Sequence, residues 1–321
     1  MKPRYCLVPV LALALTNAAA QGALVNGALE WERMELSATV TLDLAGAGIR
    51  LPAGRARAEA LLEDEYPALI QPFVLAIQVD SDSTLGDLID RGEISLHTGD
   101  SFAANAHRIP PSLSPDLSTI FARYTVSLRD ISRQLIRHTR PREVQSPLVP
   151  LPTDSYTGII IIADETLRVH GRSSSASMVP CIFPKIWDSE MTLVYERNMV
   201  DPNFDRRQNR NSPDFGQTPA PRSSAGARAA DYAGESMVRY TSRDRIMGRD
   251  PSGIDRDLAS LVGENPLRII ARGVFGEVPT DPIIDKDDAL LILSSEANRR
   301  LLREGRVVLV LAKEELKKIL P

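Results

Sequence analysis

The sequence has few cysteines, no excess of charge of one sign and no long apolar run after its first residues. Only 2 of its 321 residues are cysteine, too few for a fold built on disulfides. With 38 basic and 42 acidic residues the net charge is −4, which argues against a nucleic-acid-binding protein. No segment reaches the roughly 20 apolar residues that span a bilayer. The remaining composition, 43% hydrophobic and 25% charged, is that of a globular protein with one or two domains.

The first residues have the pattern of a secretory signal peptide. Lys2 and Arg4 precede an apolar run over residues 5–15, and the small residues 18–20 come just before Gln21. A basic start, a short apolar region and a small-residue end are typical of an export signal that is cleaved off. Residues 1–20 are therefore predicted to be a signal peptide and the mature chain to be periplasmic, with an association with the outer membrane left open. The alternative is a buried N-terminal helix.

The two cysteines differ in their expected fates. Cys6 lies near the start of the apolar run, so it would leave with the signal peptide, and its position does not favour a lipid anchor. Cys181 lies among apolar neighbours and is predicted to be buried and inert. The alternative for Cys181 is a disulfide between two chains.

Residues 30–135 read as an N-terminal module that mixes helices and strands. Polar and apolar residues alternate over 36–44 and again over 120–128, which predicts two half-buried strands. A helix is expected from Arg55, with Pro67 and Pro72 kinking or ending it. Thr84 and Asp87 resemble a capping box that starts a short helix over 85–90. Residues 97–117 are predicted to be a loop.

Residues 136–153 are proline-rich and are predicted to link this module to a second one, over 154–321. Expected elements of the second module are buried strands over 159–162, 267–274 and 307–311, a further strand over 191–196, an acidic turn over 281–288, a helix over 289–303 ended by Gly305, and a basic helix over 313–319. Residues 201–257 are rich in arginine and acids and are predicted to be a long irregular insertion. This insertion is either a partner-binding arm or a solvated loop. The predicted fold class is α+β, with small sheets that carry helices on one face.

No pattern in the chain defines a reaction, so no catalytic, cofactor-binding or metal-binding residue is predicted. The candidate side chains for such roles have simpler explanations as turn, surface or helix-capping residues. His97, His107, His138 and His170 lack metal-ligand spacing, and the Asp281, Asp285, Asp287 and Asp288 group lacks the spacing of a calcium loop, so Asp285 or Asp287 is expected to cap a helix. Ser173–Ser175 and Asp164–Glu165 read as turns, and the Gly46 and Gly48 pair has Leu51 where a dinucleotide-binding loop needs glycine.

Three stretches together carry a family resemblance. They are the strand 36–44 with the helix after it, the run Tyr156-Thr157-Gly158 with its isoleucines and the later Pro180 to Asp188 segment, and the stretch from Asn265 to Gly273. This combination resembles the twenty-kilodalton surface lipoprotein and FlgP group of envelope proteins from flagellated diderm bacteria. In physical terms, Gly158 is expected to permit a close backbone approach where its strand begins.

The resemblance implies a self-assembling envelope protein without catalytic activity. The expected function is a non-enzymatic periplasmic scaffold or assembly subunit of a cell-envelope structure such as the flagellar motor, with other envelope or motor proteins as partners. The first alternative is a secreted ligand-binding or adhesion module. An enzyme, as a hydrolase with an unrecognised site, is the third possibility.

Overall fold

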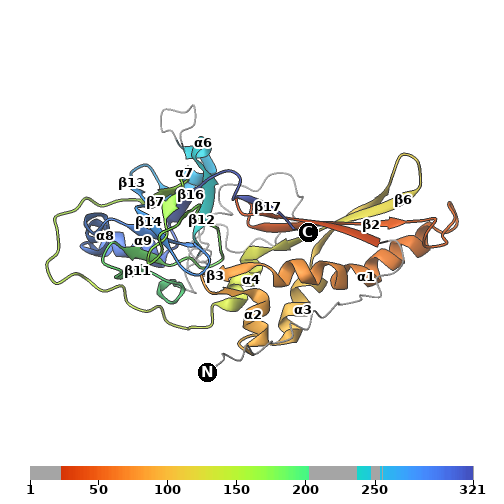
Figure 1. The fold of residues 1–321 in the computed structure, drawn as a ribbon, viewed down its shortest axis with the longest axis horizontal. Coiled ribbons are helices and arrows are strands. Elements are labelled where there is room, and N and C mark those ends of the chain that lie inside the picture. The colour runs from red at the N-terminus through yellow and green to blue at the C-terminus, as the bar shows by residue number, and fades with distance from the viewer. Residues whose placement is uncertain (1–22, 202–236, 247–253, 255, 321) are drawn as a thin grey trace, which may run out of the picture.

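The protein consists of two α+β domains that lie side by side in an elongated body (Figure 1). The computed structural model describes residues 23–201, 237–246, 254 and 256–320. The predicted signal peptide and Cys6 lie outside the described residues. The α+β fold class predicted from the sequence is confirmed.

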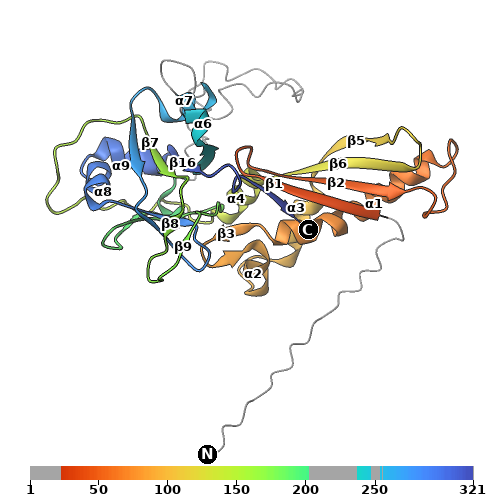
Figure 2. The same ribbon diagram turned by 45° about the horizontal axis from the view of Figure 1, so that its top comes forward.

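The N-terminal domain is a five-stranded antiparallel sheet with helices on one face (Figures 1 and 2). Its strand order is β17-β1-β2-β6-β5, with β17 (Lys317–Leu320) contributed by the far end of the chain. Its elements are β1 (Ala23–Glu30), β2 (Glu35–Asp43), α1 (Arg55–Leu75), β3 (Gln78–Asp80), β4 (Ser83–Thr84), α2 (Leu85–Asp90), α3 (Leu96–Ala104), β5 (His107–Leu113), β6 (Thr119–Ser127) and α4 (Leu128–Leu135).

The alternation in β2 and β6 places one set of side chains in the core. Leu36, Ala38, Val40 and Leu42 are buried, while the alternate residues Ser37, Thr39 and Thr41 stay partly exposed. Helix α1 covers this face, and its Phe73 ring comes so close to Gly27 of β1 that an added Cβ would lie 3.1 Å from the ring. Both strands and the capping-box helix α2 agree with the sequence prediction.

The structure corrects the N-terminal prediction at two places. Pro67 and Pro72 do not end helix α1, which runs through both to Leu75, because buried Ile70 and Val74 hold its second half against the sheet and offset the lost backbone hydrogen bonds. The predicted loop 97–117 instead contains most of α3 and the whole of β5. Its prolines, Pro110 and Pro111, are tolerated because β5 is an edge strand whose register shifts between Ile109 and Ser112.

The second domain contains a four-stranded parallel sheet of order β12-β16-β7-β13 and a mixed sheet of order β11-β10-β15-β14. Its elements are β7 (Gly158–Ala163), β8 (Leu167–Arg168), β9 (Ser175–Ala176), β10 (Ile186–Asp188), β11 (Leu193–Tyr195), the 3-10 helix η1 (Arg197–Met199), β12 (Arg239–Ser242), α6 (Arg243–Ile246), α7 (Arg256–Val262), β13 (Pro266–Ile270), β14 (Gly273–Phe275), β15 (Asp281–Ile284), α8 (Lys286–Leu293), α9 (Glu296–Arg303), β16 (Val307–Leu311) and β17 (Lys317–Leu320).

The parallel sheet is buried on both faces, as expected for β7 and β16. Ile160, Val308 and Val310 face a small core that includes Leu258 of α7. Residues on the opposite face, such as Ile161, join the main core, which extends into the N-terminal domain. Helices therefore cover both faces of this sheet, whereas helices on one face alone were predicted (Figure 1).

Several boundaries in the second domain differ from the prediction. The strand expected over 267–274 is divided into β13 and β14, and the helix expected over 289–303 is divided into α8 and α9. The acidic turn expected over 281–288 is β15 followed by the first turn of α8. Asp285 caps α8, as predicted: its carboxylate accepts a hydrogen bond from the Asp287 N–H.

The region predicted as an irregular insertion, 201–257, contains part of the core. Residues 202–236 lie outside the described residues. Residues 237–246, however, contain β12, which pairs with β16, and Val238, Tyr240 and Ile246 are buried. The prediction failed here because a four-residue strand among many polar residues gives a weak apolar pattern.

The end of the described chain joins the two domains. Residues 313–319 were expected to form a basic helix, but 317–320 form β17, which pairs antiparallel with β1 from Gly27↔Leu320 to Glu30↔Lys317 (Figure 2). The strand leaves the second domain after β16 and completes the N-terminal sheet. The basic residues that suggested a helix, Lys317 and Lys318, are instead exposed side chains of an edge strand, where charge is favoured.

Candidate functional site

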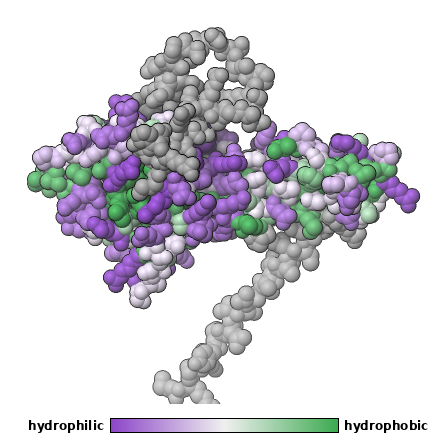
Figure 3. Space-filling model, turned by 90° about the horizontal axis from the view of Figure 1, so that it is seen from above, coloured by the Kyte–Doolittle hydropathy of each residue, from purple (hydrophilic) through white to green (hydrophobic). Residues whose placement is uncertain are grey.

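The N-terminal sheet leaves the face opposite α1 uncovered by any helix of the described chain. Leu24 of β1 pairs with Thr41 of β2, which pairs in turn with Phe121 of β6, so these three side chains form one row across the open face. Leu24 is 69% exposed and Phe121 39% exposed. Figure 3 shows this side of the molecule, where apolar and neutral surface lies among hydrophilic surface over the N-terminal domain. The open face is therefore a broad surface with exposed apolar residues.

The next row of the open face is less apolar. Asn26 pairs with Thr39, Thr39 with Arg123, and Arg123 with Ile109 of the edge strand β5. Arg123 is the one charged member of these two rows, among the residues that the structure describes. Exposed apolar residues with few charges beside them are a feature of surfaces that contact other macromolecules.

A hollow of about 410 Å³ in the second domain is lined by three arginines, Arg168, Arg172 and Arg272, together with His170. None of the described residues that line this hollow is acidic. Arg272 lies 3.6 Å from the Asp285 carboxylate, measured from Nε to Oδ2. Within the described chain, Arg168 and Arg172 have no hydrogen-bonded or ion-paired side-chain partner. We call this hollow the arginine pocket.

Two backbone segments that are distant in sequence form the arginine pocket. The β8–β9 hairpin is closed by the Val169 N–H, which donates to the Ser174 carbonyl (3.0 Å), and its turn passes through Gly171 at φ +76°. The His170 N–H donates to the Val274 carbonyl of β14 (2.8 Å). An added Cβ at Gly273 would lie 3.0 Å from the Arg168 carbonyl oxygen, so glycine permits this close approach. Backbone hydrogen bonds and this close approach therefore hold together the two segments that carry the three arginines.

A buried polar network lies between the domains. The Tyr240 hydroxyl donates to the Cys181 carbonyl (2.8 Å) and accepts from the Cys181 N–H (3.1 Å). Cys181 is fully buried, as predicted, and burial raises the pKa of its thiol well above the ordinary range. Such a thiol stays protonated and unreactive, so the network serves structure rather than nucleophilic chemistry.

Asp281 is the most deeply buried carboxyl group of this network. Its Oδ1 accepts hydrogen bonds from the Lys185 N–H (3.1 Å) and the Thr280 hydroxyl (2.9 Å). Its Oδ2 and the Nε1 of Trp187 are both buried with no hydrogen-bond partner among the described residues. Burial raises the pKa of Asp281 above its usual value.

The other side chains considered from the sequence do not come together into one site. His97 and His107 are exposed on separate elements, and the His138 Nε2 lies 2.8 Å from the Val200 carbonyl oxygen. Asp164 forms an ion pair with Arg243 (2.5 Å). Ser173–Ser175 lie in the β8–β9 hairpin, and Gly46 and Gly48 lie in the turn after β2, beside a hollow of about 490 Å³ lined by Gly48, Arg50 and Leu117.

Over the described parts of the chain, no group of three or more His, Cys, Asp or Glu side chains is arranged to hold a metal ion. None of the helices in those parts combines the length and the apolar character needed to cross a membrane.

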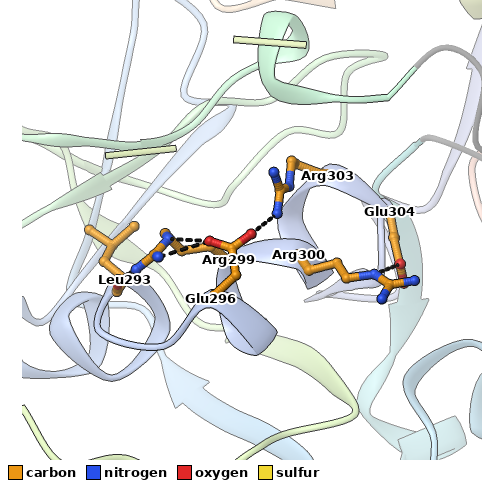
Figure 4. Close-up of polar contacts among 6 residues, drawn as sticks. All are labelled: Leu293, Glu296, Arg299, Arg300, Arg303 and Glu304. Carbon is orange, nitrogen blue, oxygen red and sulfur yellow. Dashed lines mark hydrogen bonds and ion pairs between the residues drawn. The ribbon is translucent and has the colours of Figure 1, made fainter. Parts of the chain in front are cut away.

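The arginines on α9 form hydrogen bonds and ion pairs with neighbouring groups of the second domain (Figure 4). Glu296 accepts hydrogen bonds from Arg299 (2.8 Å, Nη2 to Oε2) and from Arg303, while Arg299 also donates to the Leu293 carbonyl at the end of α8. The hydrogen bond from Arg299 is the main reason that the pKa of Glu296 is lowered. These arginines fix the corner between α8 and α9, in contrast to Arg168 and Arg172 of the arginine pocket, which have no ion-pair partner among the described residues.

The Thr157-Gly158 motif anchors the start of β7 to the end of α7. The Thr157 hydroxyl donates to the Val262 carbonyl (2.6 Å) and accepts from the Asn265 N–H (2.9 Å). An added Cβ at Gly158 would lie 2.5 Å from the Cα of Val262, so only glycine fits there. The close backbone approach expected at Gly158 is thus confirmed.

The fold and these surfaces describe a two-domain α+β protein that shares one sheet between its domains. Residues 24–134 match the family model of the Treponema pallidum Tp0624 N-terminal domain, and residues 158–214 and 223–313 match that of the Tp0624 second domain. The matches span most of the chain and occur in the same order, so the chain belongs to the family that shares these two Tp0624 domains. A search of curated proteins found no match.

These matches correct the resemblance drawn from the sequence. The matched family is named for Tp0624 and not for the surface-lipoprotein and FlgP group. The coarser expectation, a relative in a flagellated diderm bacterium, agrees with the matches. The correction has a simple cause, since the motifs compared were short and reflect the local anchoring of Thr157 and Gly158 rather than a function.

Sequence reasoning missed the arginine pocket. Arg168 and Arg172 lie about 100 residues before Arg272, and no spacing rule connects them. The only local signal was the Arg-Val-His-Gly-Arg run over 168–172, whose glycine indicates a tight turn flanked by arginines.

Proposed function

We propose that this protein is a non-enzymatic scaffold or assembly subunit of a bacterial cell envelope, exported through its N-terminal signal and working by protein–protein contact. The partners are other envelope proteins, among them those of the flagellar motor, and further copies of this chain. The observation that carries the proposal is the open face of the N-terminal sheet. It presents Leu24 and Phe121 in one row on a sheet whose other face is packed against α1.

The joined domains support this role. A scaffold must hold its contact surfaces in a fixed relation, and β17 ties the second domain into the sheet that bears the open face. Further backbone hydrogen bonds cross between the domains, from the Ile182 N–H to the Gln78 carbonyl (3.0 Å) and from the Phe183 N–H to the Val79 carbonyl (2.8 Å). Both contacts position the open face relative to the second domain.

The test is a comparison of matched variants in the native host. The tagged full-length chain is purified from detergent-solubilised envelope fractions after mild crosslinking, and the masses of its complexes are measured. The double variant L24D/F121D places two charges on the open face, whereas the control L96D places one on exposed Leu96 of α3, which is 59% exposed. We expect large complexes from the wild type and L96D, and their loss in L24D/F121D.

Two results would contradict the proposal. One is a wild-type chain that remains in the cytoplasm or is recovered as a monomer from the envelope. The other is an L24D/F121D variant that is folded by circular dichroism and still forms the same complexes. In a flagellated host, normal motors and motility after deletion of the gene would exclude the flagellar version alone.

A ligand-binding module is the second candidate function. The arginine pocket favours it, because a hollow lined by several arginines and no acid is typical of sites for anionic ligands. A purified monomer that retains a small ligand would support this candidate over the scaffold.

A further inference from the structure

We propose that the arginine pocket binds a small, multiply charged oxyanionic ligand through phosphate or carboxylate groups. The proposal does not depend on the scaffold function, since it concerns a different domain and a different kind of partner. The guanidinium group is a planar fork of N–H donors that matches the oxygens of both groups.

The charge balance of the arginine pocket is the first argument. Three arginine residues line one hollow that has no acidic lining residue, so the hollow carries an excess of positive charge. Asp285 lies 3.6 Å from Arg272, whereas Arg168 and Arg172 have no ion-pair partner among the described residues. Arginines on α9, by contrast, are paired with Glu296 and Glu304. An oxyanion in the hollow would supply the missing negative charge.

The rigidity of the backbone is the second argument. Arg168 and Arg172 flank a tight turn, in which the Arg172 N–H donates to the Val169 carbonyl (3.1 Å). Arg272 is held by its own N–H, which donates to the Ile283 carbonyl (2.7 Å). The hairpin and the mixed sheet hold the backbone of all three arginines in place. Less backbone conformational entropy is therefore lost when a ligand binds.

The size and surroundings of the hollow give the class of ligand. A volume of about 410 Å³ exceeds the space for one inorganic ion and falls in the range of small-molecule sites. His170 adds two ring nitrogens, and its ring meets Phe275 edge-on with centroids 6.0 Å apart. Ser189 also lines the hollow. The pocket thus offers charge, hydrogen-bonding groups and room for a small organic anion.

The experiment is isothermal titration of the full-length chain with two probes, sodium pyrophosphate and sodium tricarballylate, at low and matched ionic strength. We expect saturable one-to-one binding of at least one probe, with a Kd below about 1 mM. The preferred probe identifies the group, phosphate or carboxylate. The double variant R168Q/R172Q is expected to weaken binding at least tenfold. Both residues are exposed, so this variant should retain the wild-type melting temperature.

The control is R57Q, which removes one positive charge, against two in R168Q/R172Q, from exposed Arg57 on α1 in the other domain. We expect its affinity to equal that of the wild type. The proposal is overturned if neither probe shows saturable binding, if R168Q/R172Q binds as the wild type does, or if R57Q weakens binding as much as R168Q/R172Q does. The last outcome would mean that net charge alone attracts the probes.

Discussion

The indole ring of Trp31 in the N-terminal domain meets the ring of Tyr240 in the second domain edge-on, with centroids 5.6 Å apart and planes at 70°. Both residues are 2% exposed and belong to one continuous core. The backbone N–H of Trp31 donates a hydrogen bond to the Leu316 carbonyl (2.9 Å), which lies on the segment that leads into β17. The two domains therefore share a core as well as a sheet, and they should unfold together.

The substitution Trp31→Ala tests this coupling. Removing a buried aromatic side chain is expected to cost about 3–5 kcal/mol. Because the cavity opens onto Tyr240, the loss should destabilise both domains in one transition. Urea unfolding followed by circular dichroism and by the fluorescence of the remaining Trp187 should give coincident curves at a lower midpoint. W31F, which keeps a ring, is the milder control. A separate transition of Trp187 at the wild-type midpoint would show that the domains are independent.

Strand β17 offers a pair of neighbouring positions with opposite surroundings. Leu320 is 6% exposed and faces the core, whereas Ile319 is 78% exposed on the open face. An aspartate at 320 buries an unpaired charge, which should cost several kcal/mol and lower the melting temperature of the whole chain. An aspartate at 319 should change the free energy of unfolding by no more than about 0.5 kcal/mol. Equal effects of L320D and I319D on thermal unfolding would show that β17 is not bound as described.

The local patterns that predicted structure well were those with a physical cause inside a short window. Alternation in 36–44 and the Thr84–Asp87 capping box each depend on a few neighbouring residues, and both are seen. The full length of helix α1 and the strand β12 could not be predicted because tertiary contacts decide them: Val74 packs on a sheet formed by residues far away, and β12 needs β16 beside it. Within the candidate site, the arginine pocket could not be predicted at all, since the approach of Arg168 to Gly273 is a property of the completed fold.

Thr157 should contribute more to the stability of the fold than the size of its side chain suggests. Its hydroxyl satisfies both the Val262 carbonyl and the Asn265 N–H, so T157V leaves two backbone groups without their partner. We expect a loss of about 1–3 kcal/mol in the free energy of unfolding. T157S keeps the hydroxyl and should stay closer to the wild type. If chemical denaturation gave T157V and T157S the same stability, the loss would come from packing and not from the hydrogen bonds.

Asp281 should make stability depend on pH in the direction opposite to most carboxylates. Burial raises its pKa in the folded chain above the value of 3.8 that it has when exposed to water. The native state therefore holds the proton more tightly than the unfolded state does. This contribution to stability is fully present below pH 3.8 and is lost as the pH rises through the folded pKa.

The variant D281N isolates this effect because its side chain stays neutral at every pH while keeping an oxygen for the Lys185 N–H and the Thr280 hydroxyl. Its free energy of unfolding, compared with the wild type, should increase from about pH 4 upward and level off above the folded pKa of Asp281. Urea unfolding at a series of pH values measures the difference. Titration of Asp87, whose pKa is lowered by hydrogen bonds from Thr84, is common to both proteins and cancels. A difference that is constant or that falls with pH would mean that Asp281 is charged in the folded protein at little cost, with Trp187 or a bound water completing its hydrogen bonds.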